Sequence, residues 1–280
     1  MGHDGLARAS IHGVSDTASP RRFYRALRDQ LGSLRRVYGR GNRVVRHDDF
    51  AQKAEAVLLL HGFFQTRNVW EVMEDRLRYD GYGVFSFDLG GLFARFNTER
   101  AGDLAEHVAG KIERICARTG LERFHIVGHS KGGLIAREYV QHHGGDRRVA
   151  SLVTLGTPHH GTPTAALGVW LMGAGVLSRS PYDLLPNSRF LQKLRQAPFP
   201  AQIPLTSVYS RSDIVVPWWG SVLIGGPEES HLHNRPVTGV GHTALTYDPG
   251  VYRIVRRALE DAHGGPLRER RDVPLPAPAR

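Results

Sequence analysis

The stretch Phe124-His-Ile-Val-Gly-His-Ser-Lys-Gly-Gly-Leu134 carries the strongest structural signal in this 280-residue chain. Residues 124–127 form a mostly apolar run that predicts a strand, and a helical pattern begins at Lys131. Between them, the Gly-x-Ser-x-Gly pattern centred on Ser130 predicts a tight turn. A serine at such a junction stands exposed above a sheet edge, and the glycines let the two backbones pass closely. Ser130 is therefore a candidate nucleophile, and a turn without catalytic consequence is the alternative.

Strands and helices alternate on both sides of this motif. Residues 56–60 are wholly apolar, which is typical of a strand buried on both faces of a parallel sheet. The other predicted strands lie at residues 82–87, 124–127, 150–155, 205–209 and 236–240, and the predicted helices at 70–79, 100–119, 131–142 and 251–262. This alternation predicts an α/β fold with helices on both faces of a mostly parallel central sheet.

Both chain ends and one internal stretch depart from this pattern. Residues 1–54 form a basic N-terminal extension, in which residues 21–38 predict an amphipathic helix. Its apolar stripe is expected to dock on the main domain, residues 55–265, and binding to an anionic membrane is the alternative. Residues 161–200 form an insertion without a strand signal. The tail at 266–280 is rich in proline and arginine, and we expect it to be disordered.

The loop His61-Gly62-Phe63-Phe64 directly follows the strand at residues 56–60. Acyl transfer needs two amide donors aimed at the developing oxyanion. One comes from the residue after the nucleophile and the other from the loop after an earlier strand. Lys131 and Phe63 are the candidates for these donors, and Phe64 would shift the second by one position. A plain strand cap is the alternative role of the loop.

Position, not residue type, must identify a catalytic base among the 15 histidines. Where the nucleophile stands in a strand–turn–helix of this Gly-x-Ser-x-Gly type, the order along the chain is serine, acid, histidine. His242 follows the last predicted strand and is the candidate base. Asp213 follows the strand at residues 205–209 and is the candidate acid that fixes the ring tautomer. Asp248 is its main rival but is placed to cap the closing helix, and Asp183 lies in the insertion.

The insertion at residues 161–200 is markedly apolar. Its large apolar side chains are Leu167, Val169, Trp170, Leu171, Met172, Val176 and Leu177. This composition predicts a lid or an acyl-binding wall over Ser130, and a static helical cap is the alternative. Trp218 and Trp219, which follow the candidate acid, are expected to line the same pocket.

A further motif, Leu155-Gly-Thr-Pro-His-His-Gly-Thr162, follows the fourth predicted strand. With the loops above, it resembles the bacterial triacylglycerol lipase and esterase branch of the α/β hydrolases over about residues 56–262. The resemblance implies hydrolysis of carboxylic esters through an acyl-enzyme and without a cofactor, and the apolar insertion favours esters with apolar acyl groups. An acyltransferase or a glycolipid deacylase with the same triad is the alternative. The residues expected to contact substrate are His61, Phe64, His129, Trp170 and Trp218.

Two features depart from the pattern of this family. Lys131 stands where an uncharged residue, often methionine or glutamine, is more familiar. Its charge either favours anionic substrates or points into solvent. Many such lipases are secreted, yet no leader is visible in residues 1–20. We predict no metal site, because no acidic cluster beyond Asp248 lies near His242.

The chain carries a formal net charge of +10. No zinc-ligand or nucleic-acid-binding motif accompanies this charge, so we expect no nucleic-acid partner. Cys116 is expected to be a buried thiol, and no apolar run reaches the length of a membrane span. These features predict a cytoplasmic protein acting on a small acyl ester or lipid. Peripheral contact with a lipid interface and the oligomeric state are left open. A non-catalytic binding module is a further hypothesis, against which the complete set of Ser, Asp and His candidates argues.

Overall fold

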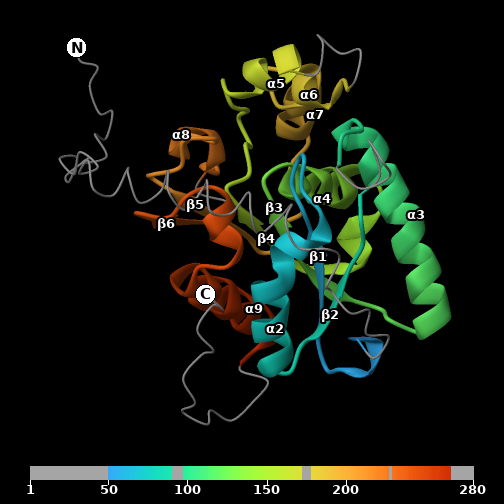
Figure 1. The fold of residues 1–280 in the computed structure, drawn as a ribbon. Coiled ribbons are helices and arrows are strands. Elements are labelled where there is room, and N and C mark those ends of the chain that lie inside the picture. Colours follow the sequence, from blue (N-terminus) through green and yellow to red (C-terminus); the bar gives the residue numbers. More distant parts are fainter. Residues whose placement is uncertain (1–49, 90–96, 172–177, 227–228, 266–280) are drawn as a thin grey trace, which may run out of the picture.

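The computed structural model describes residues 50–89, 97–171, 178–226 and 229–265. The helix predicted at residues 21–38 and the tail at 266–280 lie outside these ranges. Within the described ranges, six strands form one parallel sheet in the order β2-β1-β3-β4-β5-β6 (Figure 1). They are β1 (Ala56–Leu60), β2 (Gly83–Ser86), β3 (Phe124–His129), β4 (Val149–Leu155), β5 (Leu205–Ser210) and β6 (Leu232–Val237). The predicted α/β fold class is confirmed.

Four long helices cover the two faces of the sheet. Helices α2 (Glu71–Tyr79) and α9 (Pro249–His263) lie on one face, and α3 (Ala101–Thr119) and α4 (Lys131–His142) lie on the other (Figure 1). Each begins and ends within two residues of its predicted bounds. The helical periodicity of the sequence was therefore sufficient to predict the bounds of the four helices that cover the sheet.

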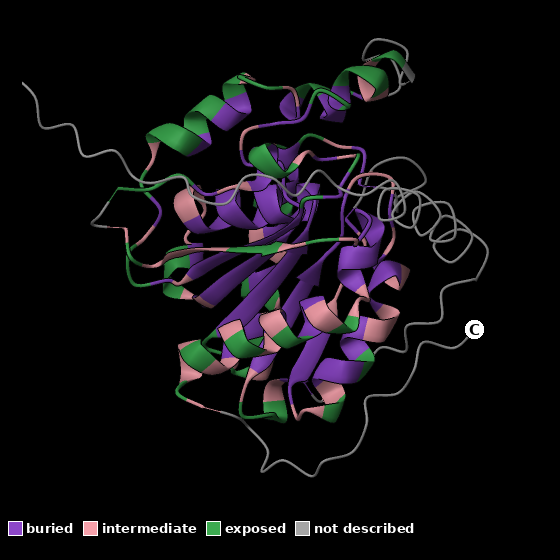
Figure 2. Ribbon diagram, turned by 90° about the vertical axis from the view of Figure 1, so that its left-hand side faces the viewer, coloured by how far each residue is buried: buried purple, intermediate pink, exposed green. Residues whose placement is uncertain are grey.

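Strand β1 shows why the centre of the sheet is apolar on both faces. Leu58 and Leu60 pack into the core beneath α3 and α4, whereas Val57 and Leu59 pack into the core beneath α2 and α9. Successive side chains of a strand point to opposite faces, so a strand covered on both sides needs an apolar residue at every position. Figure 2 shows the resulting buried sheet between partly exposed helices. Cys116 on α3 is buried in the first of these cores, as predicted.

The described part of the insertion contains three short helices: α5 (Ala165–Leu171), α6 (Ser180–Asp183) and α7 (Arg189–Gln196). They lie together at the top of the view in Figure 1. The hydroxyls of Thr162 and Thr164 donate to the carbonyl oxygen of Val215 at 2.7 and 2.6 Å. The insertion is therefore tied to the loop that follows β5. Residues 172–177, which include three of its apolar side chains, lie outside the described ranges.

Short helical turns complete the described chain: η1 (Phe50–Gln52), η2 (Arg67–Trp70), η4 (Gly145–Arg147), α8 (Trp218–Ser221) and η6 (Thr243–Thr246). No helix within the described ranges is both long and apolar enough to cross a lipid bilayer.

The sixth strand lies earlier in the chain than predicted. The apolar pattern placed it at residues 236–240, but β6 spans Leu232–Val237 and pairs with β5. It is an edge strand, and none of its residues is fully buried. A strand at an edge needs no continuous apolar run and tolerates a proline, here Pro236, because one row of its backbone groups pairs with no other strand of the described ranges. The predicted bounds of this strand were wrong because they rested on a run of apolar residues, and β6 is the most polar strand of the sheet.

Candidate active site

Ser130 stands at a sharp turn between β3 and α4. Its φ of 54° and ψ of −124° lie where residues other than glycine are rarely found. Its N–H donates to the carbonyl oxygen of Leu155 at 2.9 Å, which ties the turn to the end of β4. A Cβ added to Gly132 would lie 2.1 Å from the carbonyl oxygen of Leu60, so α4 approaches β1 this closely only with glycine there. The strand–turn–helix context predicted for Ser130 is present.

The candidate base and acid are in contact with each other. His242 donates through Nδ1 to Asp213 Oδ2 at 2.6 Å, and both side chains are buried. The other carboxylate oxygen, Oδ1, accepts the N–H groups of Val215 and Val216 at 2.8 and 2.9 Å. A neutral imidazole that donates through Nδ1 carries its free lone pair on Nε2. The pair can therefore act as a base whose proton-accepting atom is Nε2.

Backbone and ring contacts bring His242 to the side of Ser130. Leu155 accepts the Ser130 N–H, and the next residue, Gly156, is so close to His242 that an added Cβ would lie 3.1 Å from Nδ1. His129, which precedes the candidate nucleophile, lies beside His242 with ring centroids 4.6 Å apart. The structure thus pairs the candidate histidine with the candidate acid and places both near the candidate serine, at the edge formed by the carboxyl ends of the strands.

The two rival carboxylates are engaged elsewhere. Asp248 caps α9, with Oδ1 accepting two backbone N–H groups at 2.7 and 2.9 Å. Asp183 accepts from the Arg100 guanidinium at 3.1 Å and from the first N–H of α3 at 2.9 Å. Both therefore hold the beginnings of helices. Across the described ranges, no three His, Cys, Asp or Glu side chains gather in a way that could hold a metal ion.

The loop after β1 lies directly beside Ser130. A Cβ added to Gly62 would lie 2.9 Å from the Cβ of Ser130. The Gly62 N–H donates to Gln65 Oε1 at 2.9 Å, and the Gln65 N–H donates back to the Gly62 carbonyl oxygen at 3.3 Å. Phe64 within this turn has a φ of 55°. These bonds fix the loop next to the candidate nucleophile, where a second amide donor is needed.

His61 and His129 brace this arrangement from inside. Leu89 N–H donates to His61 Nε2 at 3.3 Å, and His61 Nδ1 donates to the carbonyl oxygen of the next residue at 3.1 Å. Burial lowers the pKa of His61 to about 4, so the ring is neutral at pH 7. Both rings have an exposed fraction of 0% and offer a substrate no surface in this conformation. Their predicted contact with substrate stays a prediction.

Gln65 connects the loop to both histidine elements and was missed by the sequence reasoning. His129 Nδ1 faces Gln65 Oε1 at 2.9 Å, and His129 Nε2 faces the carbonyl oxygen of His242 at 3.0 Å. Both partners are acceptors, and burial lowers the pKa of His129 well below its ordinary value. A neutral ring therefore donates to one of them at a time. No motif marks Gln65, and its only signal is a polar residue three positions after Gly62.

The side chain of Lys131 does not reach solvent. Its side chain is fully buried, and Nζ donates to the carbonyl oxygens of Asn97, at 3.0 Å, and Glu99. Nζ also lies 5.9 Å from the ring centroid of Phe63. Burial lowers the pKa of Lys131 to about 7. The expectation that this cation points into solvent is wrong, because the chain at residues 97–99 covers it, and no short motif signals so distant a backbone contact.

The remaining predicted substrate contacts are more exposed. Trp170 on α5 and Trp218 on α8 have exposed fractions of 74% and 49%, and Phe64 is half-buried. The exposed large apolar residues of the insertion's α5 and of residues 214–224 are Leu167, Trp170, Ile214, Trp218, Trp219 and Ile224. Exposed apolar side chains mark a site that binds apolar ligands or partners where they form one contiguous patch. The lid role of the insertion stays a prediction.

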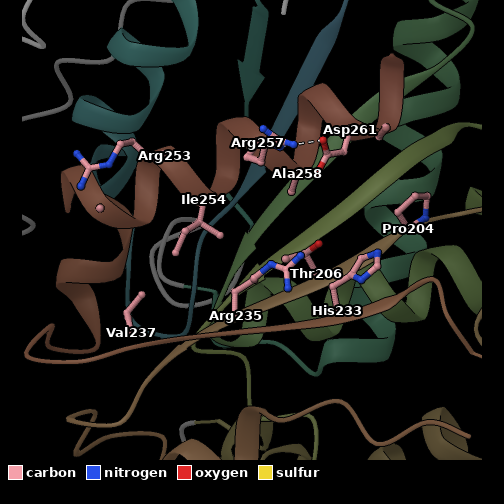
Figure 3. Close-up of a pocket in the computed structure, with 12 residues that line it drawn as sticks. Pro204, Thr206, His233, Arg235, Val237, Arg253, Ile254, Arg257, Ala258 and Asp261 are labelled. Atoms are coloured by element: carbon pink, nitrogen blue, oxygen red, sulfur yellow. Dashed lines mark ion pairs between the residues drawn. The ribbon is translucent and has the colours of Figure 1, made fainter. Parts of the chain in front are cut away.

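A separate cavity of about 610 Å³ lies between β6 and α9 (Figure 3). His233 and Arg235 line it from β6, and Arg257 and Asp261, which form an ion pair at 3.0 Å, line it from α9. None of the candidate catalytic residues lines this cavity. It is therefore distinct from the site at the carboxyl edge of the sheet.

Parts of the chain are similar in sequence to known proteins. Residues 55–172 match a family model described as alpha/beta hydrolase fold. A triacylglycerol lipase of Burkholderia plantarii is 30% identical over 127 residues, which are 43% of this chain and 34% of that protein. The dihydrolipoyllysine-residue acetyltransferase component of the acetoin cleaving system of Cupriavidus necator is 38% identical over 85 residues, 30% of this chain and 22% of that protein. The chain thus spans about a third or less of the length of these relatives.

Solved structures resemble the whole described fold. The mature form of the Bacillus licheniformis lipase BlEst2 superposes with a TM-score of 0.59 at 19% sequence identity. The match covers 77% of this chain and 95% of that one. Likeness at this identity establishes a shared fold.

Proposed function

Because the chain has the α/β-hydrolase fold and resembles a triacylglycerol lipase in sequence, we propose that it is a serine carboxylester hydrolase of the lipase and esterase type. Ser130 is the proposed nucleophile, His242 the base and Asp213 the acid that orients the base. The observation that carries the proposal is the 2.6 Å contact between His242 and Asp213 beside the strained turn at Ser130. The same combination of serine, histidine and carboxylate performs acyl transfer on several unrelated folds.

In the proposed first half-reaction, His242 Nε2 removes the proton from Ser130 Oγ as that oxygen bonds to the ester carbonyl carbon. The carbonyl electron pair moves to oxygen and forms an oxyanion. Asp213 stabilises the imidazolium that results and holds its orientation. When the tetrahedral intermediate collapses, His242 gives the proton to the departing alcohol. The acyl group then remains on Ser130.

In the second half-reaction, water replaces Ser130 as the attacking group. His242 takes a proton from the water, the carboxylic acid leaves, and Ser130 recovers its proton. The oxyanion forms in both halves and needs two donors. We assign these to the N–H groups of Lys131 and Phe63, and one such donor typically contributes about 3 kcal/mol of transition-state stabilisation.

The proposed substrates are esters with apolar acyl groups. Trp170 on α5 and Trp218 on α8 offer exposed apolar surface. The residues before α5 bond to the Val215 carbonyl oxygen in the acid loop, and α8 follows that loop directly along the chain. A substrate that buries its acyl chain against such surface gains about 0.8 kcal/mol for each methylene removed from water. We accordingly propose that kcat/KM rises with acyl chain length over a series of short esters.

Replacing Ser130 with alanine tests the proposal. Ser130→Ala is expected to abolish turnover of p-nitrophenyl esters while leaving the circular dichroism spectrum unchanged, because only the attacking oxygen is lost. Ser151→Ala is the matched control, since the Ser151 hydroxyl bonds to His125 at the amino end of the sheet. Full activity in Ser130→Ala would refute the proposed nucleophile.

The same triad serves acyl transfer if an alcohol or amine, not water, attacks the acyl-enzyme. The products formed with and without an added alcohol acceptor distinguish the two reactions. We expect free carboxylic acid as the main product in both cases. A transferred ester as the main product would replace hydrolysis with acyl transfer and leave the triad in place.

A further inference from the structure

The ammonium of Lys131 is an unusual group to find inside this fold. It is fully buried and directly follows the proposed nucleophile, and its bonds within the described ranges go to backbone carbonyl oxygens and not to a carboxylate. A buried charge without a direct ion pair costs several kcal/mol unless hydrogen bonds compensate it. An uncharged side chain of similar length would fill the same space without that cost. The cation therefore needs a reason beyond packing.

The bonds of Nζ show what the cation holds. It donates to the carbonyl oxygens of Asn97 and Glu99, in the chain just before α3. From there, Asn97 Nδ2 donates to the carbonyl oxygen of His61 at 2.8 Å. His61 begins the loop at residues 61–65, hereafter the oxyanion loop. Lys131 thus reaches the oxyanion loop through one intermediate residue.

A second contact joins the same two elements directly. The Lys131 ammonium lies 5.9 Å from the centroid of the Phe63 ring, within the range of a cation–π interaction. Asn97 has a φ of 51°, in the left-handed region that asparagine adopts more readily than most residues. Its bonds to Lys131 and His61 connect this turn to both elements.

We propose that the Lys131 ammonium positions the oxyanion loop: its backbone N–H supplies one oxyanion donor, and its side chain fixes the loop that supplies the other. This inference deepens the proposed hydrolase function and depends on it for its catalytic consequence. Lys131 acts on Phe63 through Asn97 and through the ring contact, so its side chain is a positioning group that does not touch the substrate.

The charge of this group should change with pH near neutrality. Burial lowers the pKa of Lys131 to about 7, and the charges of Asp183, Glu99 and Asp103 oppose that fall. His61, the other titratable group beside it, stays neutral. Below about pH 7 the ammonium is present, and as the pH rises through this value it loses its proton. Its bonds to the two carbonyls then weaken from charge-assisted to neutral hydrogen bonds. Positioning is therefore strongest on the acidic side.

Exchange of backbone amides with deuterium tests the positioning without any assay of activity. In full-length Lys131→Met, residues 61–65 and 97–101 are expected to exchange faster than in the native protein. Lys53→Met is the matched control, because Lys53 is exposed before the amino end of β1, whereas the oxyanion loop follows the carboxyl end of that strand. It should leave both segments unchanged. Unchanged exchange in Lys131→Met would overturn the proposal, whatever reaction the protein catalyses.

Kinetics with p-nitrophenyl esters test the catalytic consequence. In Lys131→Met, kcat is expected to fall about 10-fold or more with KM within about twofold, because a misplaced donor weakens only transition-state binding. The native protein should lose kcat as the pH rises through about 7, and the variant should lack this decline. Lys131→Gln, which keeps a neutral donor, should fall between the two. Faster exchange with an unchanged kcat would overturn the catalytic role. A native protein inactive on every ester would refute the proposed function, and the exchange result would still decide the positioning.

Discussion

The proposed acid–base half of the site and the proposed oxyanion half are held by different means. Asp213 and His242 bond to each other directly, side chain to side chain, at 2.6 Å. The oxyanion loop is held by buried side chains that bond to backbone groups: Gln65 to Gly62, and Lys131 to Asn97. Loss of either partner of a direct pair removes the whole interaction. A loop with several supports should keep part of its geometry, and therefore part of the activity, when one support is lost.

The largest effect is expected on the acid–base half. Asp213→Asn should lower kcat about 10,000-fold, because an amide no longer fixes the productive tautomer of His242. Steady-state kinetics at pH 7 measure the loss. Asp248→Asn is the matched control, since the Asp248 carboxylate caps α9. If both variants lost activity equally, the assignment of the acid would fail.

An intermediate effect is expected on the oxyanion half. Gln65→Leu keeps the side-chain volume and removes the acceptor that holds the Gly62 N–H. Because Lys131 and His61 still support the loop, kcat should fall about 10-fold, against the 100- to 1,000-fold typical of losing a donor outright. Gln141→Leu, on α4 away from this loop, is the control. A loss as large as that of Asp213→Asn would erase the proposed difference between the two halves.

The smallest effect is expected where the insertion meets the acid loop. Thr162→Val removes one hydroxyl bond to the Val215 carbonyl oxygen, whereas Thr164 still bonds to it. Loss of one such bond costs about 1 kcal/mol of stability, so kcat/KM should change by no more than about fivefold. Thr119→Val at the end of α3 removes a comparable hydroxyl bond elsewhere. Thermal unfolding and long-chain ester kinetics of the two variants separate stability from activity.

The same two halves differ in how far the sequence could predict them. The contact between Asp213 and His242 was predictable from chain order, because each residue follows a strand of one parallel sheet and the carboxyl ends of such strands meet. Periodicity likewise predicted the strand at Ala56–Leu60 and the helix at Lys131–His142.

The bracing of the oxyanion half was not predictable in this way. Lys131 and Asn97 are 34 positions apart, and their bond joins a side chain to a backbone carbonyl that every residue possesses. Residue type therefore carries no signal for such a contact, and only the path of the chain reveals it. For Lys131, the sequence left a choice between a charge that favours anionic substrates and one that points into solvent, and the fold buries the side chain.

Within the described part of the chain, β6 is an outer strand of the sheet, and this edge has a consequence for the behaviour of the protein in concentrated solution. Along β6, the backbone carbonyl oxygens of odd-numbered residues face β5. The carbonyl oxygen of His231, just before the strand, accepts from Leu205 N–H, and that of Val237 accepts from Arg211 N–H. With a period of two, the even-numbered residues turn their backbone groups outward. One of these is Pro236, which has no N–H to offer, and its neighbour Arg235 is exposed and charged. A strand from another molecule that paired with this edge would find no N–H donor at Pro236 and would lie beside the charged Arg235. This combination discourages aggregation through edge-to-edge pairing.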